Sequence, residues 1–428
     1  MPIQSTRQNA CRTSCELFAF ILVAVLWNPS DACASGEDPS ASMFSFSGFG
    51  TLGVVHSSEH KADFTSTIFK PDGAGYSHDW SAAVDSLIAA QVSAQFTPQL
   101  TAVLQVVAEQ NYDNSYRPHV EWANIKYQFT PDFNIRVGRT VLPGFLHSDT
   151  RAVGYTYAWV RPPVEVYRLL PITTGDGVDV SYHVHIGDFT NTLQANFGKN
   201  HARLPQDEGG GSSDATHLWG ISNTSEYGAL SVRITYQKSK LAIPAFDALF
   251  DAFRQFGEQG AAIADRYNSQ PFVFTVIGAG ASYDPGDWFV MGEWGRVVSD
   301  SVLGTRGAWY VSGGYRLGKI TPYVTYAKAT ADNLSDPGLT VAALPAELAG
   351  RAASLNAALD SILSSTIPAE NTISVGGRWD FMKKADLKLQ FDRTRIGAGS
   401  AGVLSNIQPG FQLGGRVNVF SATVDFVF

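Results

Sequence analysis

Apolar and polar residues alternate strictly at the end of the chain. The apolar positions are Phe420, Ala422, Val424, Phe426 and Phe428, and the polar positions between them are Ser421, Thr423 and Asp425. Alternation with a period of two residues puts hydrocarbon on one face of a strand and water on the other. The same alternation recurs along the chain and predicts sixteen strands, near 44–56, 83–96, 100–110, 118–129, 132–140, 175–185, 189–199, 214–224, 228–238, 271–283, 287–300, 304–316, 319–330, 371–381, 385–395 and 414–428.

The connections between these segments alternate between short and long. Short turns rich in turn-forming residues lie at 97–99, 130–132, 187–188, 225–228, 284–286, 317–318 and 382–384. Long connections lie near 57–82, 111–117, 141–174, 200–213, 239–270, 331–370 and 396–413, and 301–303 is a short exception. This arrangement predicts an all-β fold, a closed up-and-down transmembrane antiparallel β-barrel of about 16 strands, because closure leaves no strand edge unpaired in lipid.

The start of the chain predicts a cleaved signal peptide over residues 1–34. Arg7 and Arg12 precede an apolar run at 17–27, and Ala32-Cys33-Ala34 follows a helix-breaking Asn28-Pro29. The apolar run is shorter than the roughly 20 residues that span a bilayer. All three cysteines lie in this segment, so residues 35–428, the predicted barrel, contain no thiolate metal site or disulfide.

Composition agrees with a barrel and excludes one class of partner. The net charge of -8 argues against nucleic acid binding. Aromatic residues gather beside the short turns, as in the girdles of membrane barrels: Phe96, Phe129, Phe133, Phe189, Tyr227, Tyr283, Tyr315, Phe381 and Phe428. The terminal strand, which ends at Phe428, resembles the signal of bacterial outer-membrane β-barrels. That resemblance implies a location in the outer membrane of a Gram-negative bacterium, in contact with outer-membrane lipid and lipopolysaccharide.

The inward positions of the strands are hydrophilic and carry both signs of charge. They are Asp85, Gln91, Ser93, Gln95, Gln105, Glu109, Asn134, Arg136, Asp179, His183, His185, Gln194, Asn196, Arg233, Gln237, Arg378, Lys388, Gln390 and Asp392. Such a lining favours a water-filled interior over a packed apolar core, and sixteen strands enclose an aqueous channel in porins. His183 and His185 lie on one strand face, but two ligands alone do not make a metal site. No metal, cofactor or catalytic residue is predicted.

The connection at 141–174 is the most distinctive of the long loops. Its aromatic and aliphatic residues and its Pro162-Pro163 pair suit a stiff segment folded against the inner wall. It is predicted to constrict the pore. Together with charged residues on the wall, it is predicted to set the electric field inside the pore. The predicted pore-lining and constriction residues are Arg136, Asp149, Arg151, Arg161, Glu165, Arg168, Arg233 and Arg378.

Two further connections, 239–270 and 331–370, are predicted to be extracellular loops with helical segments. Apolar residues recur at helical spacing from Pro244 to Tyr267 and from Pro345 to Leu363. These helices either fill space among the loops or form a lid or receptor surface. The outward positions of the second to fourth strands are small or aliphatic, which predicts a homotrimer packed through these early strands.

The chain resembles a trimeric porin of proteobacterial outer membranes. The resemblance is carried by residues 47–53, the strand end Arg136-Val137-Gly138-Arg139, the loop that follows it and the terminal Phe428. An ending of this kind also resembles the signal read by the barrel-assembly machinery. The constriction loop lacks the Pro-Glu-Phe-Gly type signature of general porins, which leaves pore size and selectivity open.

The resemblance implies passive diffusion of small hydrophilic solutes and ions through a channel that is not an enzyme. Three alternatives remain open from the sequence: a gated, substrate-specific channel, a non-conducting adhesion or structural barrel, and a lipase-type barrel. A lipase needs a Ser or Thr beside a His held by Asn or Asp, and proximity of that kind is not visible in a sequence.

Overall fold

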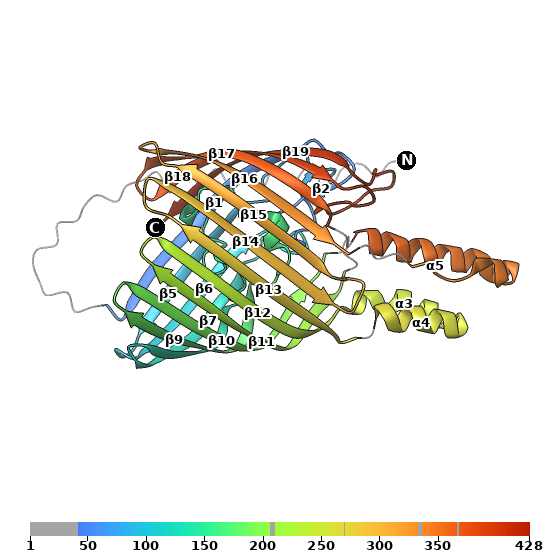
Figure 1. Ribbon diagram of the computed structural model, residues 1–428, viewed down its shortest axis with the longest axis horizontal. Helices are drawn as coiled ribbons and strands as arrows, with labels where there is room; N and C mark the ends of the chain where they lie inside the picture. Colours follow the sequence, from blue (N-terminus) through green and yellow to red (C-terminus); the bar gives the residue numbers. More distant parts are fainter. Residues whose placement is uncertain (1–41, 206–209, 269, 333–335, 366–367) are drawn as a thin grey trace, which may run out of the picture. The chain divides into compact units, whose positions relative to one another are not determined.

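The computed structural model describes residues 42–205, 210–268, 270–332, 336–365 and 368–428. Residues Met43–Phe428 form one compact unit, a barrel of long antiparallel strands (Figure 1). The predicted signal peptide at 1–34 lies outside the described residues.

Sixteen strands of 9 to 16 residues form the barrel wall, and each coincides with a segment predicted from the alternating pattern. They are β1 (Phe44–Ser57), β5 (Leu87–Gln95), β6 (Leu100–Glu109), β7 (His119–Thr130), β8 (Phe133–Val141), β9 (Thr174–Ile186), β10 (Phe189–Arg203), β11 (Ser212–Tyr227), β12 (Leu230–Ala242), β13 (Phe272–Tyr283), β14 (Trp288–Ser299), β15 (Arg306–Tyr315), β16 (Ile320–Ala331), β17 (Glu370–Met382), β18 (Ala385–Ile396) and β19 (Gly415–Val427). The two-residue strands β2 (Asp63–Phe64), β3 (Ala74–Gly75) and β4 (Trp80–Ser81) lie in the first long connection.

The first and last strands close the barrel. β1 pairs with β5 on one side and with β19 on the other, in a register that places Phe49 opposite Val427. Gly48 and Phe428 exchange two backbone hydrogen bonds of 3.1 and 2.9 Å at this seam. The Phe428 ring covers Gly48 so closely that a Cβ there would lie 2.1 Å from Cζ. The predicted closed sixteen-strand antiparallel barrel is confirmed.

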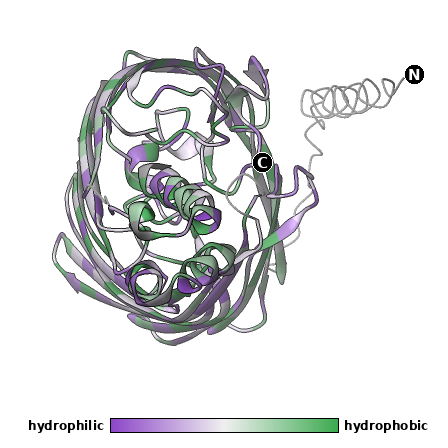
Figure 2. Cartoon of the chain, turned by 90° about the vertical axis from the view of Figure 1, so that its right-hand side faces the viewer, coloured by the Kyte–Doolittle hydropathy of each residue, from purple (hydrophilic) through white to green (hydrophobic). Residues whose placement is uncertain are grey.

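The connections are sorted by length between the two ends of the barrel. The seven short turns lie at one end of the barrel, and the long connections start and end at the other (Figure 1). Viewed from the long-connection end, the strands form a complete ring (Figure 2).

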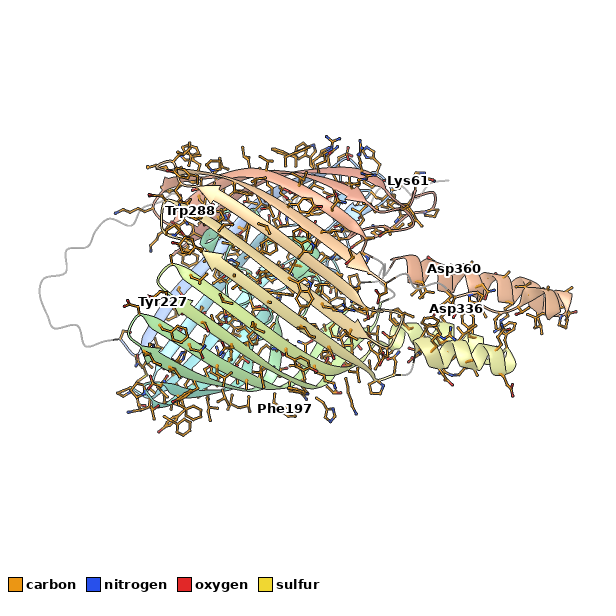
Figure 3. The ribbon with its side chains drawn as sticks, viewed as in Figure 1. Lys61, Phe197, Tyr227, Trp288, Asp336 and Asp360 are labelled. Carbon is orange, nitrogen blue, oxygen red and sulfur yellow. The ribbon has the colours of Figure 1, made fainter. Side chains whose placement is uncertain are left out.

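The outer face of the wall is apolar. Exposed apolar side chains such as Phe197, Ile234 and Val375 alternate with buried polar ones, and Phe197 projects away from the barrel in Figure 3. Several aromatics predicted to flank the short turns are exposed: Phe96, Phe129, Tyr227, Tyr283, Tyr315 and Phe428. A closed barrel with an apolar outer face satisfies its backbone polar groups in lipid. The predicted outer-membrane location is confirmed by this architecture.

The interior is less hydrophilic than the sequence analysis predicts. A buried apolar cluster joins the β8–β9 connection (residues 142–173) to the inner faces of β11 through β16. Phe289 and Val297 of β14 and Tyr310 of β15 belong to it. The expectation that the interior offers no packed apolar core is therefore wrong for this half of the barrel, because the connection supplies a partner for inward apolar side chains.

Three helices with their own apolar core extend beyond the long-connection end (Figure 1). The short 3₁₀ helix η3 (Pro244–Phe246) leads into α3 (Asp247–Arg254) and α4 (Gly257–Tyr267), and α5 (Ala346–Ser365) packs against α3. The predicted helix of 244–267 is interrupted because Gly257 adopts a φ of +67°. Among the helices described, none has both the length and the apolar character needed to cross a membrane.

Candidate functional site

The β8–β9 connection is held mainly by side chains of the late strands, and Thr173 adds a hydrogen bond of 2.8 Å to Glu121 of β7. It contains the short helices η1 (Gly154–Thr156) and α2 (Val164–Tyr167), and Pro162-Pro163 leads into α2. Its hydrogen bonds reach side chains of β12, β14, β15, β16, β17, β18 and β19.

Arg161 forms the most completely buried ion pair of the connection. Its guanidinium donates hydrogen bonds of 2.7 and 2.5 Å to the two carboxylate oxygens of Asp85, just before β5. It also donates to Ser421 of β19 at 2.7 Å. The side chains of Arg161 and Asp85 are 7% and 4% exposed. A bidentate pair of this kind fixes both distance and orientation, so it ties the connection to the wall beside the seam.

A second buried polar cluster binds η1. Lys388 of β18 donates a hydrogen bond of 2.5 Å to the carbonyl oxygen of Gly154 and lies 3.0 Å from the carboxylate of Asp425. Both side chains are fully buried. Asp425 also accepts a hydrogen bond from Thr51 of β1. A Cβ at position 154 would lie 2.0 Å from Asp425 Oδ1, so the close approach of η1 to the wall requires glycine.

Trp159 anchors the middle of the connection. Its side chain is 2% exposed, and its Nε1 lies 2.9 Å from Ser312 Oγ and 3.1 Å from Thr325 Oγ1. The indole meets the ring of Tyr310 edge-on, with the ring centroids 5.6 Å apart. Buried indole groups need a partner for their N–H, and the two hydroxyls of β15 and β16 supply it.

Glu293 of β14 anchors the start of the connection. Its carboxylate accepts a hydrogen bond of 2.6 Å from the backbone N–H of Leu146. The hydroxyls of Tyr167 and Tyr310 donate to the same carboxylate at 2.7 and 2.8 Å. Three donors satisfy this buried acid. Arg233 of β12 adds a hydrogen bond of 2.7 Å to the carbonyl oxygen of Phe145.

The other side of the interior is open. A cavity of about 520 Å³ lies between the connection and the inner faces of β1 and β5 to β10. Residues of both signs line it, and Lys70 pairs there with Glu109 at 3.2 Å. His119 lies 3.6 Å from Glu121 on the same wall. The connection therefore packs against side chains of the late strands, and the cavity, bordered by charges of both signs, lies beside the early strands.

The structure distributes the eight residues predicted to line the pore between the cavity and the packed connection. Asp149, Arg151 and Arg161 border the open cavity. Arg233 lies 3.6 Å from Asp149, and the guanidinium of Arg378 donates to the carbonyl oxygen of Tyr155 at 2.6 Å. These two wall arginines therefore contact the connection.

The remaining predicted residues have other partners. Arg136 pairs with Asp179 of β9 at 2.8 Å, on the wall itself. Glu165 is 4% exposed on α2. Arg168 donates to the carbonyl oxygen of Val403 and, at 3.0 Å, to Ser405, both in the last long connection. Glu165 and Arg168 thus pack the connection against its surroundings.

Four residues that hold the connection are absent from the predicted set: Trp159, Glu293, Lys388 and Asp425. Lys388 was predicted to face inward, but nothing in the sequence pairs it with Gly154, 234 positions away. One signal was available for Glu293, since it is a lone acid within the otherwise uncharged run 288–295. A charge in such a strand predicts a buried partner, although it does not identify the partner.

Comparison with known proteins places the fold. No family model and no curated protein matches the chain. The structure is similar to the anion-selective porin from Comamonas acidovorans, with a TM-score of 0.53 and 11% identity over 90% of this chain and 99% of that chain. It is also similar to Salmonella typhi OmpF in a complex with daunomycin, with a TM-score of 0.52 and 11% identity over 90% and 97% of the chains. At this identity the likeness shows the fold, and the chain therefore has the closed β-barrel fold of Gram-negative outer-membrane porins.

Proposed function

We propose that the protein is an outer-membrane porin through which small hydrophilic solutes and ions diffuse passively. The observation that supports this most directly is the cavity beside β5 to β10, which charges of both signs border. The barrel wall encloses water where the bilayer would otherwise be hydrocarbon. A charged or polar solute inside it therefore avoids the cost of entering hydrocarbon. No catalytic step is part of the proposal.

The β8–β9 connection is proposed to constrict this channel from one side. Trp159 and Lys388 hold it against the late strands, and Arg161 ties it to the wall beside the seam. The free cross-section then lies between the connection and the early wall. Asp149 and Arg151 project from the connection toward that space. Because Lys70 and Glu109 also border it, charges of both signs act on a passing ion.

The proposed assembly is a homotrimer packed through the early strands. Outward positions of β5 to β7 combine small residues, Ala90 and Ala123, with exposed aliphatic residues, Ile88, Leu104 and Ile125. Small side chains let walls approach closely within a membrane. Native mass spectrometry or crosslinking in mild detergent tests this, and a protein that remains monomeric in both would contradict it.

Planar-bilayer recording of the refolded barrel tests the channel. Stepwise conductance with a current proportional to voltage supports passive diffusion, and steps in groups of three would also support the trimer. A conductance that appears with a single solute class, or that closes with voltage, favours a gated and substrate-specific channel. A barrel that inserts but stays silent rejects the proposal and favours an adhesion, structural or lipase-type barrel.

A further inference from the structure

The outer face of β12 to β19 carries positive charge and no negative charge. These strands are described in full, and their outward cations are Lys238, Lys240, Arg296, Lys328, Arg393, Arg395 and Arg416. All of them lie in the half of the wall nearer the long connections. The acidic residues of the same strands are on the inner side: Glu293, Glu370, Asp386, Asp392 and Asp425 are buried, and Asp380 accepts hydrogen bonds from the inward Arg378.

The positive charge is most concentrated on β18 and β19. Arg395 and Arg416 are direct register partners, and Arg393 lies two residues from Arg395 on the same face. Asn371 of β17 continues the row from Arg395 to Lys328 of β16. All four cations are exposed. Like charges that face each other directly across two strands destabilise the pairing, so an arrangement of this kind needs a source of negative charge.

That source is not in the described part of the chain. None of the described carboxylates lies within ion-pair distance of these four cations. The early wall provides a contrast, because Arg139 of β8 faces its register partner Asp176 of β9 and pairs with it at 2.7 Å. On β16 to β19 the counter-charge has to come from the surroundings, and for a barrel in a membrane these include lipid headgroups near the two ends of the strands.

An apolar surface continues below the cations, toward the short turns. Phe391 of β18 and Phe420 of β19 are direct register partners and are 46% and 37% exposed. Trp80 of β4 meets Phe420 edge-on at 6.2 Å and is itself exposed. Two residues along a strand cover about 7 Å, so the cation row and the aromatic row lie roughly 14 Å apart. A free anion would use the first row, whereas a lipid would use both.

We propose that this surface is a binding site for the phosphorylated headgroup of an anionic membrane lipid. Arg395 and Arg416 bind a phosphate through their planar guanidinium groups, which match two phosphate oxygens each. Arg393 and Lys328 extend the site to a second phosphate or acidic group. The acyl chains lie over Phe391 and Phe420. The inference rests on the location of the barrel in the membrane and does not require that the channel conducts.

Native mass spectrometry of the refolded barrel tests the site directly. The probes are a glycolipid with two phosphate groups, the zwitterionic lipid phosphatidylethanolamine and inorganic pyrophosphate. Each basic residue near an anionic lipid contributes roughly 1 kcal/mol, and about 1.4 kcal/mol corresponds to a tenfold change. The double variant R395Q/R416Q is therefore expected to bind the phosphorylated glycolipid about 30-fold more weakly. The variant R395K/R416K keeps the charge and is expected to lose less affinity.

The matched control is K383Q/K384Q, which removes the same charge from the exposed turn of the same hairpin, β17–β18. Its glycolipid affinity is expected to equal that of the unaltered protein, and phosphatidylethanolamine binding is expected to be the same in all variants. An equal loss in both double variants, or no loss in either, overturns the site. Pyrophosphate that displaces the glycolipid completely at equal concentration overturns the assignment to a lipid.

Heat-dependent mobility on a gel reports whether each variant forms the closed barrel. If R395Q/R416Q does not close, the comparison of R395K/R416K with K383Q/K384Q carries the same test. A lysine variant that binds the glycolipid as tightly as the unaltered protein then rejects guanidinium recognition. A weaker lysine variant supports it.

Discussion

Arg161 and Asp85 form a bidentate ion pair between the β8–β9 connection and the residue just before β5, with both side chains almost fully buried. Removing one partner leaves the other charge buried, which costs about 3–5 kcal/mol. Asp85→Asn is therefore expected to lower the free energy of unfolding by about that amount, although Asp392, 3.6 Å away, retains part of the charge balance.

Denaturant titration of the refolded barrel measures this loss. The double variant Asp85→Leu with Arg161→Met replaces both charges by apolar groups, so it is expected to lose less stability than Asp85→Asn. A double variant that is less stable than the single one would show that the pair stabilises the barrel through its charges.

Gly154→Ala is expected to loosen the connection, because its Cβ would meet Asp425 Oδ1 at 2.0 Å. Overpacking of this kind costs about 1–3 kcal/mol. Gly350→Ala on α5 is the matched control, since no atom lies within 4 Å of a Cβ there, and alanine is favoured in a helix. The denaturation midpoint should fall for the first variant only. Equal midpoints would mean that η1 moves away from β19 without cost.

Trp159→Ala removes an indole that is 2% exposed and leaves Ser312 and Thr325 without its N–H. Replacement of a buried tryptophan by alanine costs about 3–5 kcal/mol. We expect a larger single-channel conductance, because the connection loses its central anchor and occupies less of the lumen. Trp219→Ala on the lipid-facing side should leave conductance unchanged. A smaller conductance in Trp159→Ala would indicate that the released segment moves into the cavity.

Glu109→Gln is expected to shift ion selectivity toward anions. Its carboxylate pairs with Lys70 at 3.2 Å on the border of the open cavity, so the substitution leaves a cation there without its partner. The reversal potential under a salt gradient measures the shift. Asp360→Asn on α5 removes the same charge from an exposed position and should not change it. An equal shift in both variants would place the selective field at the mouth, outside the lumen.

Leu359→Ala is expected to unfold the helical cluster without opening the barrel. Leu359 is fully buried among α3, α4 and α5, and such truncations cost about 2–5 kcal/mol. Limited proteolysis should cut the variant within α5, while heat-dependent gel mobility stays that of a closed barrel. Leu348→Ala, at a position 41% exposed, is the control and should resist the protease. Loss of barrel mobility in Leu359→Ala would mean that helices and barrel fold as one unit.

All sixteen strands could be predicted from the sequence because lipid and water impose the period of two on each strand separately. Where the alternation is broken, the cause lies elsewhere in the chain. In β11 a bulge between Thr216 and Trp219 shifts the faces by one residue, with His217 at a φ of +48°. In β14 the inner face carries apolar residues beside Glu293, because Phe289 and Val297 belong to the cluster that includes the β8–β9 connection. Neither cause is visible within the strand itself.

The candidate site was predictable in part for the same reason. Pro162-Pro163 and the aromatic residues indicated a segment that packs against something, and the inward arginines were found by alternation. Which groups meet depends on contacts between positions such as Arg378 and Tyr155, 223 residues apart. A pattern along the chain identifies the face on which a side chain lies, but it does not identify the partner across the barrel.

The perimeter of the barrel wall and the width of the passage inside it depend on different parts of the chain. The perimeter of the wall is set by the sixteen strands and by the register in which they pair. In the proposed channel the free passage is set by residues 142–173, which lie between β8 and β9, outside the named strands. A lineage could therefore widen, narrow or recharge its passage by substitutions at a few positions of one segment, without disturbing the assembly of the wall.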